Sequence, residues 1–188
     1  IVEVLVIGAG QAGLAAGCHL SVRGIEHRIV ERARRVGDNW RERYDSLTLF
    51  TPRACSALPG RRLDGDPDGY PGRDEFADYL EAYAAFFDLR IDLGTEIRRL
   101  SKAEDGTFRA VADSGETYIS RNVILAHGPF RIPAVPDVAN GLAPSVRQFT
   151  TTDYRNPEQL PQGTVLIVGD GASGRDFAAE AARTHEVL

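Results

Sequence analysis

Apolar residues gather at the start of the chain, directly before a glycine-rich turn. Residues 2–7 (VEVLVI) are almost all apolar, and Gly8, Gly10 and Gly13 follow them. An alanine-rich stretch comes next. A short apolar run that ends at glycine is typical of a buried strand. The pattern therefore predicts a strand, a tight turn and a helix in succession.

The same pattern returns near the end of the chain. Residues 165–168 are apolar, and Gly169, Gly171 and Gly174 follow with the spacing of the first motif. The last residues, HEVL, predict the start of another strand. This second unit stops before it can cover its own apolar face. Since the sequence also contains no Met, we expect it to be part of a protein about twice as long.

The region between the two glycine motifs divides into three parts. Residues 37–72 are rich in proline and glycine, and a long irregular stretch of this kind usually lines a functional site. Residues 74–88 predict an amphipathic helix that buries its aromatic side chains. Residues 95–125 alternate in polarity and predict three strands, separated by turns at 104–106 and 114–115. The last strand is the most apolar, so we expect it to join the first sheet as a parallel strand.

These elements together predict an α/β fold with two Rossmann-like dinucleotide-binding units, each a βαβ unit with a GxGxxG turn. The predicted strands between the motifs form a small β insertion, and the second nucleotide domain is incomplete. Two phosphate sites in one chain imply two dinucleotides, and a protein that holds two usually moves electrons between them.

Each glycine of the first motif has a physical task. Gly8 permits the turn, Gly10 lets a pyrophosphate approach the backbone, and Gly13 lets helix and strand pack closely. The phosphates then meet the free amides at the start of the helix. Glu31 ends the next apolar segment, at about the distance expected of a carboxylate that binds an adenosine ribose. An ordinary βαβ unit is the alternative interpretation of the glycines alone.

Composition narrows the possible partners. The net charge of −5 leaves no basic surface for nucleic acid or for an anionic membrane, so we expect neither partner. Cys18 and Cys55 form no CxxC pair and have no metal-ligand spacing, so we expect no metal site and a reducing, cytoplasmic location. The apolar runs are too short to cross a membrane. The oligomeric state leaves no signal in the sequence.

Several motifs, in order, resemble the flavin-containing monooxygenases, including the Baeyer–Villiger enzymes and the plant-type auxin-forming flavin monooxygenases. The resemblance covers nearly the whole chain. The motifs that carry it are GAGQAGL (8–14), the pair Glu31 and Arg32, VGDNW (36–40), WRERYDSLTLFTP (40–52), YPGRDEFADYLEAYA (70–84), VILAHG (123–128) and DYRNPEQLP (153–161). It implies an FAD-binding domain over 1–145 and the start of an NAD(P)-binding domain over 146–188.

The resemblance also implies a role for individual residues. Residues of the first glycine turn and its neighbours would hold FAD: Gly8, Gly10, Gln11, Ala12, Gly13, Glu31, Arg32, Asn39, Trp40, Leu47, Ile97, Ala126, His127 and Gly128. Residues of the second turn would hold NADPH or NADH: Gly169, Gly171, Ser173 and Gly174. For Trp40, packing in the core is the alternative to a place beside the flavin. For His127, a hydrogen-bonded end of the strand is favoured over a base.

The implied chemistry belongs mostly to the cofactors. In the family, NADPH reduces FAD, and the reduced flavin reacts with O2 to a C4a-peroxide that transfers one oxygen to a small-molecule substrate. No general base is required, and we identify no catalytic residue. This chain departs from the family fingerprint before the second motif, because Thr150 stands where a His is expected, although Tyr154 matches the aromatic position.

Two alternatives remain at this point. One is a pyridine nucleotide–flavin reductase or oxidase, for which a redox CxxC would be the distinguishing feature. The other is a dinucleotide-binding module without catalytic activity.

Overall fold

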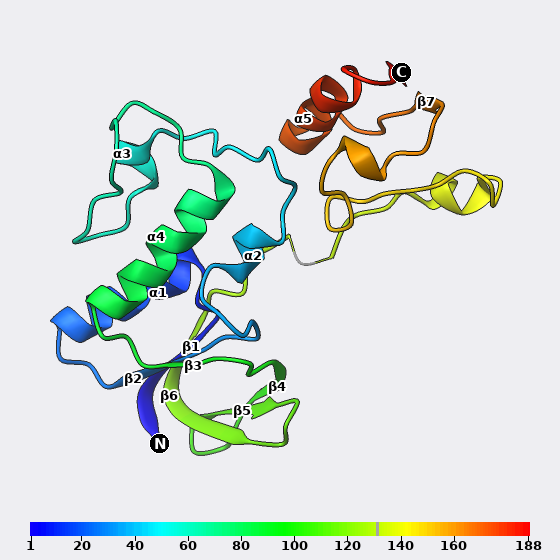
Figure 1. Cartoon of the computed structure of the whole chain (residues 1–188). Coiled ribbons are helices and arrows are strands. Elements are labelled where there is room, and N and C mark those ends of the chain that lie inside the picture. Colours follow the sequence, from blue (N-terminus) through cyan, green and yellow to red (C-terminus); the bar gives the residue numbers. More distant parts are fainter. Residues whose placement is uncertain (131) are drawn as a thin grey trace. The chain divides into compact units, whose positions relative to one another are not determined.

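The computed structural model describes residues 1–130 and 132–188 (Figure 1). They fall into two compact units. Unit 1 holds residues 1–41 and 48–129, and unit 2 holds residues 42–47 and 130–188. The short segment 42–47 therefore belongs to a different unit from the residues on either side of it.

Unit 1 is built on a six-stranded sheet with the order β3-β2-β1-β6-β5-β4. The strands β3, β2, β1 and β6 pair in parallel, whereas β6, β5 and β4 pair antiparallel. The strands span β1 Val2–Ile7, β2 His27–Val30, β3 Ile91–Asp92, β4 Ile97–Lys102, β5 Phe108–Ala112 and β6 Thr117–Leu125. The three strands predicted between residues 95 and 125 are confirmed, as is the parallel return of the last one.

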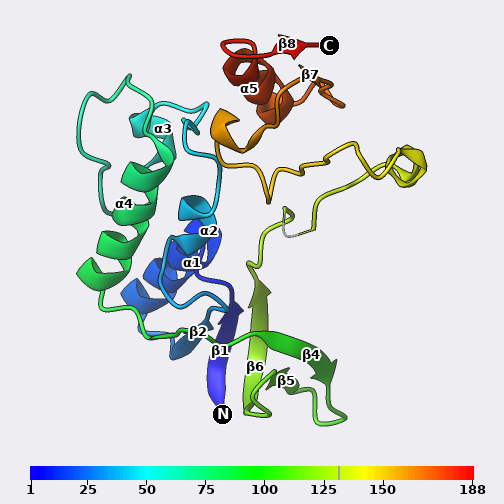
Figure 2. The ribbon, with the colours of Figure 1, turned by 45° about the vertical axis from the view of Figure 1, so that its right-hand side comes forward.

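The long strand β6 joins the two halves of this sheet. Its first residues pair with β5, and its later residues pair with β1, beside which it lies in Figure 2. Ser120 pairs on both sides, with Phe108 and with Val2. The predicted β insertion is thus a continuation of the parallel sheet rather than a separate element.

Both faces of β1 and β2 are covered, which explains the consecutive apolar residues at 4–7 and 29–30. On one face, helix α1 (Gln11–Val22) packs on β1 and β2, and α4 (Arg73–Phe86) packs on α1. On the other face, Leu5 and Val30 form a buried cluster with Ala110 of β5. Tyr118 of β6 packs against this cluster, so the antiparallel strands cover the sheet from which they extend.

Helix α4 confirms the helix predicted over residues 74–88. Phe76, Leu80 and Tyr83 are buried along one side of it. Residues 37–72 are mostly irregular, as predicted, but they contain two short helices, α2 (Asp38–Arg41) and α3 (Arg53–Ser56).

Unit 2 contains a small βαβ unit. Its two strands, β7 (Thr164–Val165) and β8 (Glu186–Val187), pair in parallel, and α5 (Ala172–Ala181) connects them. Two short 3₁₀ helices, η1 (Asp137–Gly141) and η2 (Pro157–Gln159), precede it. The strand predicted over 165–168 is shorter than expected. Leu166 and Val168 lie beyond it with 67% and 71% of their surface exposed, because the described residues offer no further layer to cover them.

Two tyrosines pack against α5 in unit 2, and one of them, Tyr44, belongs to segment 42–47. Tyr44 Oη donates a hydrogen bond to Asp176 Oδ2 at 2.5 Å, and Tyr154 Oη donates to Glu180 Oε2 at 2.9 Å. Both rings pack against Phe177, which lies between the two carboxylates on α5. Burial, reinforced by Asp176, raises the pKa of Tyr44, so this hydroxyl stays a neutral donor.

Substitutions at Ser120 and Leu5 test this description of the sheet. Ser120 is fully buried and its hydroxyl has no partner among the described residues, so Ser120→Ala should raise the free energy of unfolding by about 1 kcal/mol. Leu5→Ala, in the cluster between the two halves of the sheet, should lower it by about 2–5 kcal/mol. Chemical denaturation of the purified variants measures both. A destabilised Ser120→Ala would mean that its hydroxyl has a partner.

Candidate functional site

The first glycine turn lies where β1 ends and α1 begins. Gly8 has a φ of +107°, and a Cβ atom there would lie 2.5 Å from the carbonyl oxygen of Ala126. A Cβ atom on Gly13 would lie 1.8 Å from the carbonyl oxygen of Gly8. A Cβ atom on Gly10 would meet nothing within 4 Å. Two glycines thus serve internal packing, and the third leaves open space over the turn.

That open space faces the start of a helix without a cap. Gly10 is the N-cap of α1, and it has no side chain that could accept a hydrogen bond from the first amides. Gln11 and Ala12 in the first turn are exposed, and the turn has no acidic residue. Free amides and the positive end of the helix dipole together favour an anion. The geometry fits the pyrophosphate of a dinucleotide.

Glu31 lies at the base of the same turn. Its carboxylate accepts hydrogen bonds from the backbone N–H of Ala9 at 2.7 Å and of Ala33 at 2.9 Å. These bonds fix the carboxylate at the end of β2, next to the glycine turn. Each oxygen keeps capacity for a further donor, such as a ribose hydroxyl. Arg32, the next residue, is exposed.

The end of β6 completes this edge of the sheet. The Ala126 N–H donates to the Ile7 carbonyl at 2.8 Å, which holds it beside the glycine turn. His127 is exposed and its Nδ1 lies 2.9 Å from the Gly128 carbonyl oxygen. The glycine turn, Glu31 and residues 126–128 therefore meet at the carboxyl ends of three parallel strands, where open α/β sheets bind their ligands.

Helix α2 carries Asn39 and Trp40, which the sequence suggested lay in a loop. Asn39 is exposed. The Trp40 ring packs edge-on against Phe76 of α4, with 5.1 Å between the ring centroids. Its indole Nε1–H is buried and has no acceptor among the described residues. Trp40 thus makes a packing contact and also retains a donor for a bound group, and its place beside a flavin stays a prediction.

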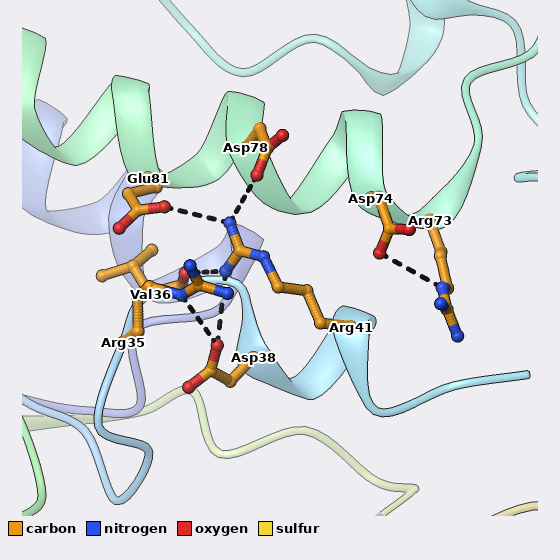
Figure 3. Close-up of polar contacts among 8 residues, drawn as sticks. All are labelled: Arg35, Val36, Asp38, Arg41, Arg73, Asp74, Asp78 and Glu81. Atoms are coloured by element: carbon orange, nitrogen blue, oxygen red, sulfur yellow. Dashed lines mark hydrogen bonds and ion pairs between the residues drawn. The ribbon is translucent and has the colours of Figure 1, made fainter. Parts of the chain in front are cut away.

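Arg41 joins α2 to α4 through hydrogen bonds (Figure 3). One guanidinium nitrogen donates to Asp78 at 2.6 Å and to Glu81 at 3.0 Å. The other donates to Asp38 at 3.3 Å and to the Val36 carbonyl at 2.8 Å. Burial disfavours the charged guanidinium, but these carboxylates outweigh it and raise the pKa of Arg41 above its ordinary value.

Two predicted FAD residues, Leu47 and Ile97, have other surroundings than the residues of the glycine turn. Leu47 belongs to unit 2, unlike the other predicted FAD residues. Ile97, the first residue of β4, packs against the cluster of Leu5, Val30 and Ala110. The contacts with FAD predicted for Leu47 and Ile97 stay predictions.

The second glycine turn repeats the geometry of the first. Gly169 has a φ of +117°, and a Cβ atom on Gly174 would lie 2.2 Å from the Gly169 carbonyl oxygen. A Cβ atom on Gly171 would meet nothing within 4 Å. Gly171 is the uncapped N-cap of α5, and Ser173 lies in its first turn. Unlike the first turn, this one carries an ion pair, because Arg175 donates to both carboxylate oxygens of Asp170.

Sequence patterns did not single out Arg41 or Tyr44, although each holds a segment that carries a predicted FAD residue. The spacing of Asp78 and Glu81 on one side of a helix is a weak signal for a basic partner. Nothing in the sequence indicates which arginine that is. Thr150, at the position where the family has His, donates its hydroxyl to Asp153 at 2.6 Å and so closes a local turn.

The described residues contain no cluster of three or more His, Cys, Asp or Glu placed to bind a metal ion. No helix in the described part of the chain has the length and apolar character needed to cross a membrane.

Comparison with known proteins identifies the family. Residues 5–187 match the model of the pyridine nucleotide-disulphide oxidoreductases. The chain belongs to this family. It is 51% identical to the uncharacterised CzcO-like oxidoreductase of Geobacillus kaustophilus, over all of this chain and 53% of that protein. It is 32% identical to the indole-3-pyruvate monooxygenase YUCCA1 of Oryza sativa, over 95% of this chain and 45% of that protein.

Among solved structures, a doubly substituted variant of the flavin monooxygenase from Stenotrophomonas maltophilia is similar over the whole chain, with a TM-score of 0.93 and 30% identity. That match covers 56% of the monooxygenase. The chain thus spans about half the length of the relatives it matches. The resemblance to flavin monooxygenases and the α/β fold with two dinucleotide motifs are confirmed.

Substitutions in the first glycine turn test the division of roles. Gly13→Ala should lower the free energy of unfolding by about 1–3 kcal/mol, because the added methyl overlaps the Gly8 carbonyl. Gly10→Ala should leave the stability of the apoprotein unchanged but weaken FAD binding, because its methyl enters the open space. Thermal unfolding and FAD titration separate the two effects. If Gly10→Ala bound FAD like the wild type, the pyrophosphate would not lie there.

Proposed function

We propose that this chain is the dinucleotide-binding part of an FAD-dependent, NAD(P)H-using oxidoreductase, a flavin monooxygenase that acts with O2 on a small molecule. The observation that carries the proposal is the repeated turn geometry. In each motif the first glycine has a positive φ, the last lies against the carbonyl oxygen of the first, and the middle one, Gly10 or Gly171, is open at the N-cap of a helix. The similarity to a plant indole-3-pyruvate monooxygenase and to a bacterial flavin monooxygenase supports the choice of reaction.

The first turn would hold FAD, within a domain over residues 1–145. The amides that follow Gly10, at Gln11 and Ala12, would bind the pyrophosphate. The Glu31 carboxylate, held by two hydrogen bonds from backbone N–H groups, would accept hydrogen bonds from the adenosine ribose hydroxyls. The indole N–H of Trp40, which lacks an acceptor, would donate to the cofactor or to a water molecule bound with it.

The second turn would hold NADPH or NADH, in a domain that begins within residues 146–188. Gly171 and Ser173 stand at its open helix start. The Asp170 carboxylate lies inside this turn and its pairing with Arg175 lowers its pKa. Because Arg175 neutralises that carboxylate, a nucleotide phosphate would approach without net repulsion from it.

FAD, when bound, supplies hydride acceptance and the reaction with O2, which no amino-acid side chain supplies. The residues of this chain bind and orient the two dinucleotides, and we assign no catalytic residue. The cytoplasmic location expected from the two isolated cysteines stays a proposal.

The visible absorption spectrum of the purified protein, before and after NADPH is added in air, tests the proposal. We expect a two-band flavin spectrum that bleaches with NADPH and then recovers as O2 is consumed. Oxygen-18 gas should label an oxidised product when the substrate is present. Gly171→Ala should keep the flavin spectrum but slow its bleaching, because the substitution acts only at the nucleotide turn.

Other outcomes would favour the alternatives. Bleaching and recovery that yield only hydrogen peroxide with every substrate tried would indicate an oxidase or a reductase. A retained flavin that NADPH and NADH do not reduce would indicate a binding module. A colourless protein that takes up no added FAD would contradict the proposed function.

A further inference from the structure

Helix α2 is too short to hold its own conformation. It has four residues, one helical turn, and isolated helices of that length are unstable in water. Yet it presents Asn39 and Trp40, two residues that the resemblance to flavin monooxygenases predicts to hold FAD. Contacts with the rest of unit 1 must therefore fix the direction in which these side chains are presented.

Those contacts are made mostly with α4 (Figure 3). A Cβ atom on Gly37, which precedes α2, would lie 2.6 Å from the Ala77 carbonyl oxygen, so the backbone runs directly against α4 there. The Trp40 ring meets Phe76 edge to face. Arg41, the last residue of α2, reaches Asp78 and Glu81. Gly37, Trp40 and Arg41 thus all contact α4.

Of these contacts, that of Arg41 is the most directional. Its side chain is only 15% exposed, although it carries a charge. It makes four hydrogen bonds, two to α4 and two to Asp38 and Val36. The same guanidinium therefore joins α2 to α4 and stabilises the turn at the start of α2. A planar guanidinium can satisfy these acceptors together, whereas an ammonium cannot match their directions.

Arg41 is also the last residue of the first of the two chain segments that form unit 1. The chain passes to unit 2 at Glu42 and returns at Thr48. The segment that follows Arg41 makes its contacts within unit 2, for example between Tyr44 and Asp176. Without the contacts of Arg41, the turn with Asn39 and Trp40 would be held only by its weaker contacts before it enters that segment. The anchor ties that turn to unit 1, where the glycine turn and Glu31 also lie.

We infer that Arg41 is a positioning residue, which through Asp78 and Glu81 holds Asn39 and Trp40 ready for the cofactor. The inference rests on the proposed function for the identity of the cofactor, FAD. The guanidinium of Arg41 donates its hydrogen bonds to protein groups. It therefore acts through α2 and does not contact the cofactor itself. If α2 were not held, FAD binding would have to order it, and the affinity would fall by that cost.

Variants at both ends of the contact test the inference. Arg41→Gln should weaken FAD binding roughly ten-fold, and Arg41→Lys should lie between it and the wild type. The double variant Asp78→Asn with Glu81→Gln should act in the same direction as Arg41→Gln. Arg28→Gln is the matched control, because it breaks an ion pair with Asp92 that joins β2 to β3 and not α2. Its FAD affinity should equal that of the wild type.

A second measurement needs no cofactor. Trp40 is the only tryptophan in the 188-residue sequence, so its fluorescence, with Trp40→Phe as the blank, reports on α2 in the apoprotein. Acrylamide quenching of Trp40 should rise in Arg41→Gln and in the double variant, with a red-shifted emission. It should stay at the wild-type level in Arg28→Gln. Far-ultraviolet circular dichroism confirms that each variant is folded.

The outcomes separate this inference from the proposed function. A folded Arg41→Gln with wild-type quenching and wild-type FAD affinity would overturn the inference, whatever the activity. If Arg41→Gln does not fold, the double variant decides, because the side chains of Asp78 and Glu81 are 73% and 45% exposed and their amides would remain in contact with water. If the wild type binds no FAD, the proposed function fails, and the quenching alone shows whether Arg41 holds α2.

Discussion

The first dinucleotide motif depends on the close approach of three backbone segments at the end of the parallel sheet. Gly8 lies against the Ala126 carbonyl, and Gly13 lies against the Gly8 carbonyl, at distances that exclude a Cβ atom. This contact brings the start of α1 onto the ends of β1 and β6. With α1 in that position, its free amides point over Gly10, and the carboxylate of Glu31 reaches the Ala9 amide. The anion site proposed at this turn is therefore a consequence of close packing.

The same constraint appears in unit 2, where Gly174 lies against the Gly169 carbonyl. The surroundings differ, however. In unit 1 both faces of the strands are covered by helices and by the antiparallel strands, whereas Leu166 and Val168 in unit 2 remain exposed. The turn in unit 2 thus repeats the contact between the first and the last glycine. How the strands around it are covered depends on how much apolar surface the neighbouring residues can bury.

Charged and polar side chains hold the irregular segments that the sheet does not reach. Arg41 joins α2 to α4, and Tyr44 and Tyr154 hold their segments against α5. Each of these groups is buried and satisfied, which makes its bond directional and costly to leave unmade. The chain between Trp40 and Thr48 is short, and it carries one anchor for each unit. The two units are therefore linked through residues next to the predicted flavin contacts.

The sequence by itself determined the elements whose signals are local. The two strand-turn-helix motifs, helix α4 and the three later strands follow from apolar period and glycine position, because these patterns reflect steric and burial rules within a few residues. The site at the glycine turn, with Glu31 and residues 126–128, follows from the rule that parallel strands end at one edge. The resemblance to flavin monooxygenases rested on the order of several motifs along the chain.

Only the tertiary structure decided the rest. It made the β insertion a continuation of the sheet, turned the expected loop at Asn39 and Trp40 into a helical turn, and placed Leu47 in the other unit. It also selected Arg41, among many arginines, as the partner of Asp78 and Glu81. These features depend on pairs of residues far apart in sequence, such as Tyr44 and Asp176. Periodicity carries no information about such pairs, because the burial and direction of each side chain are set by the element packed against it.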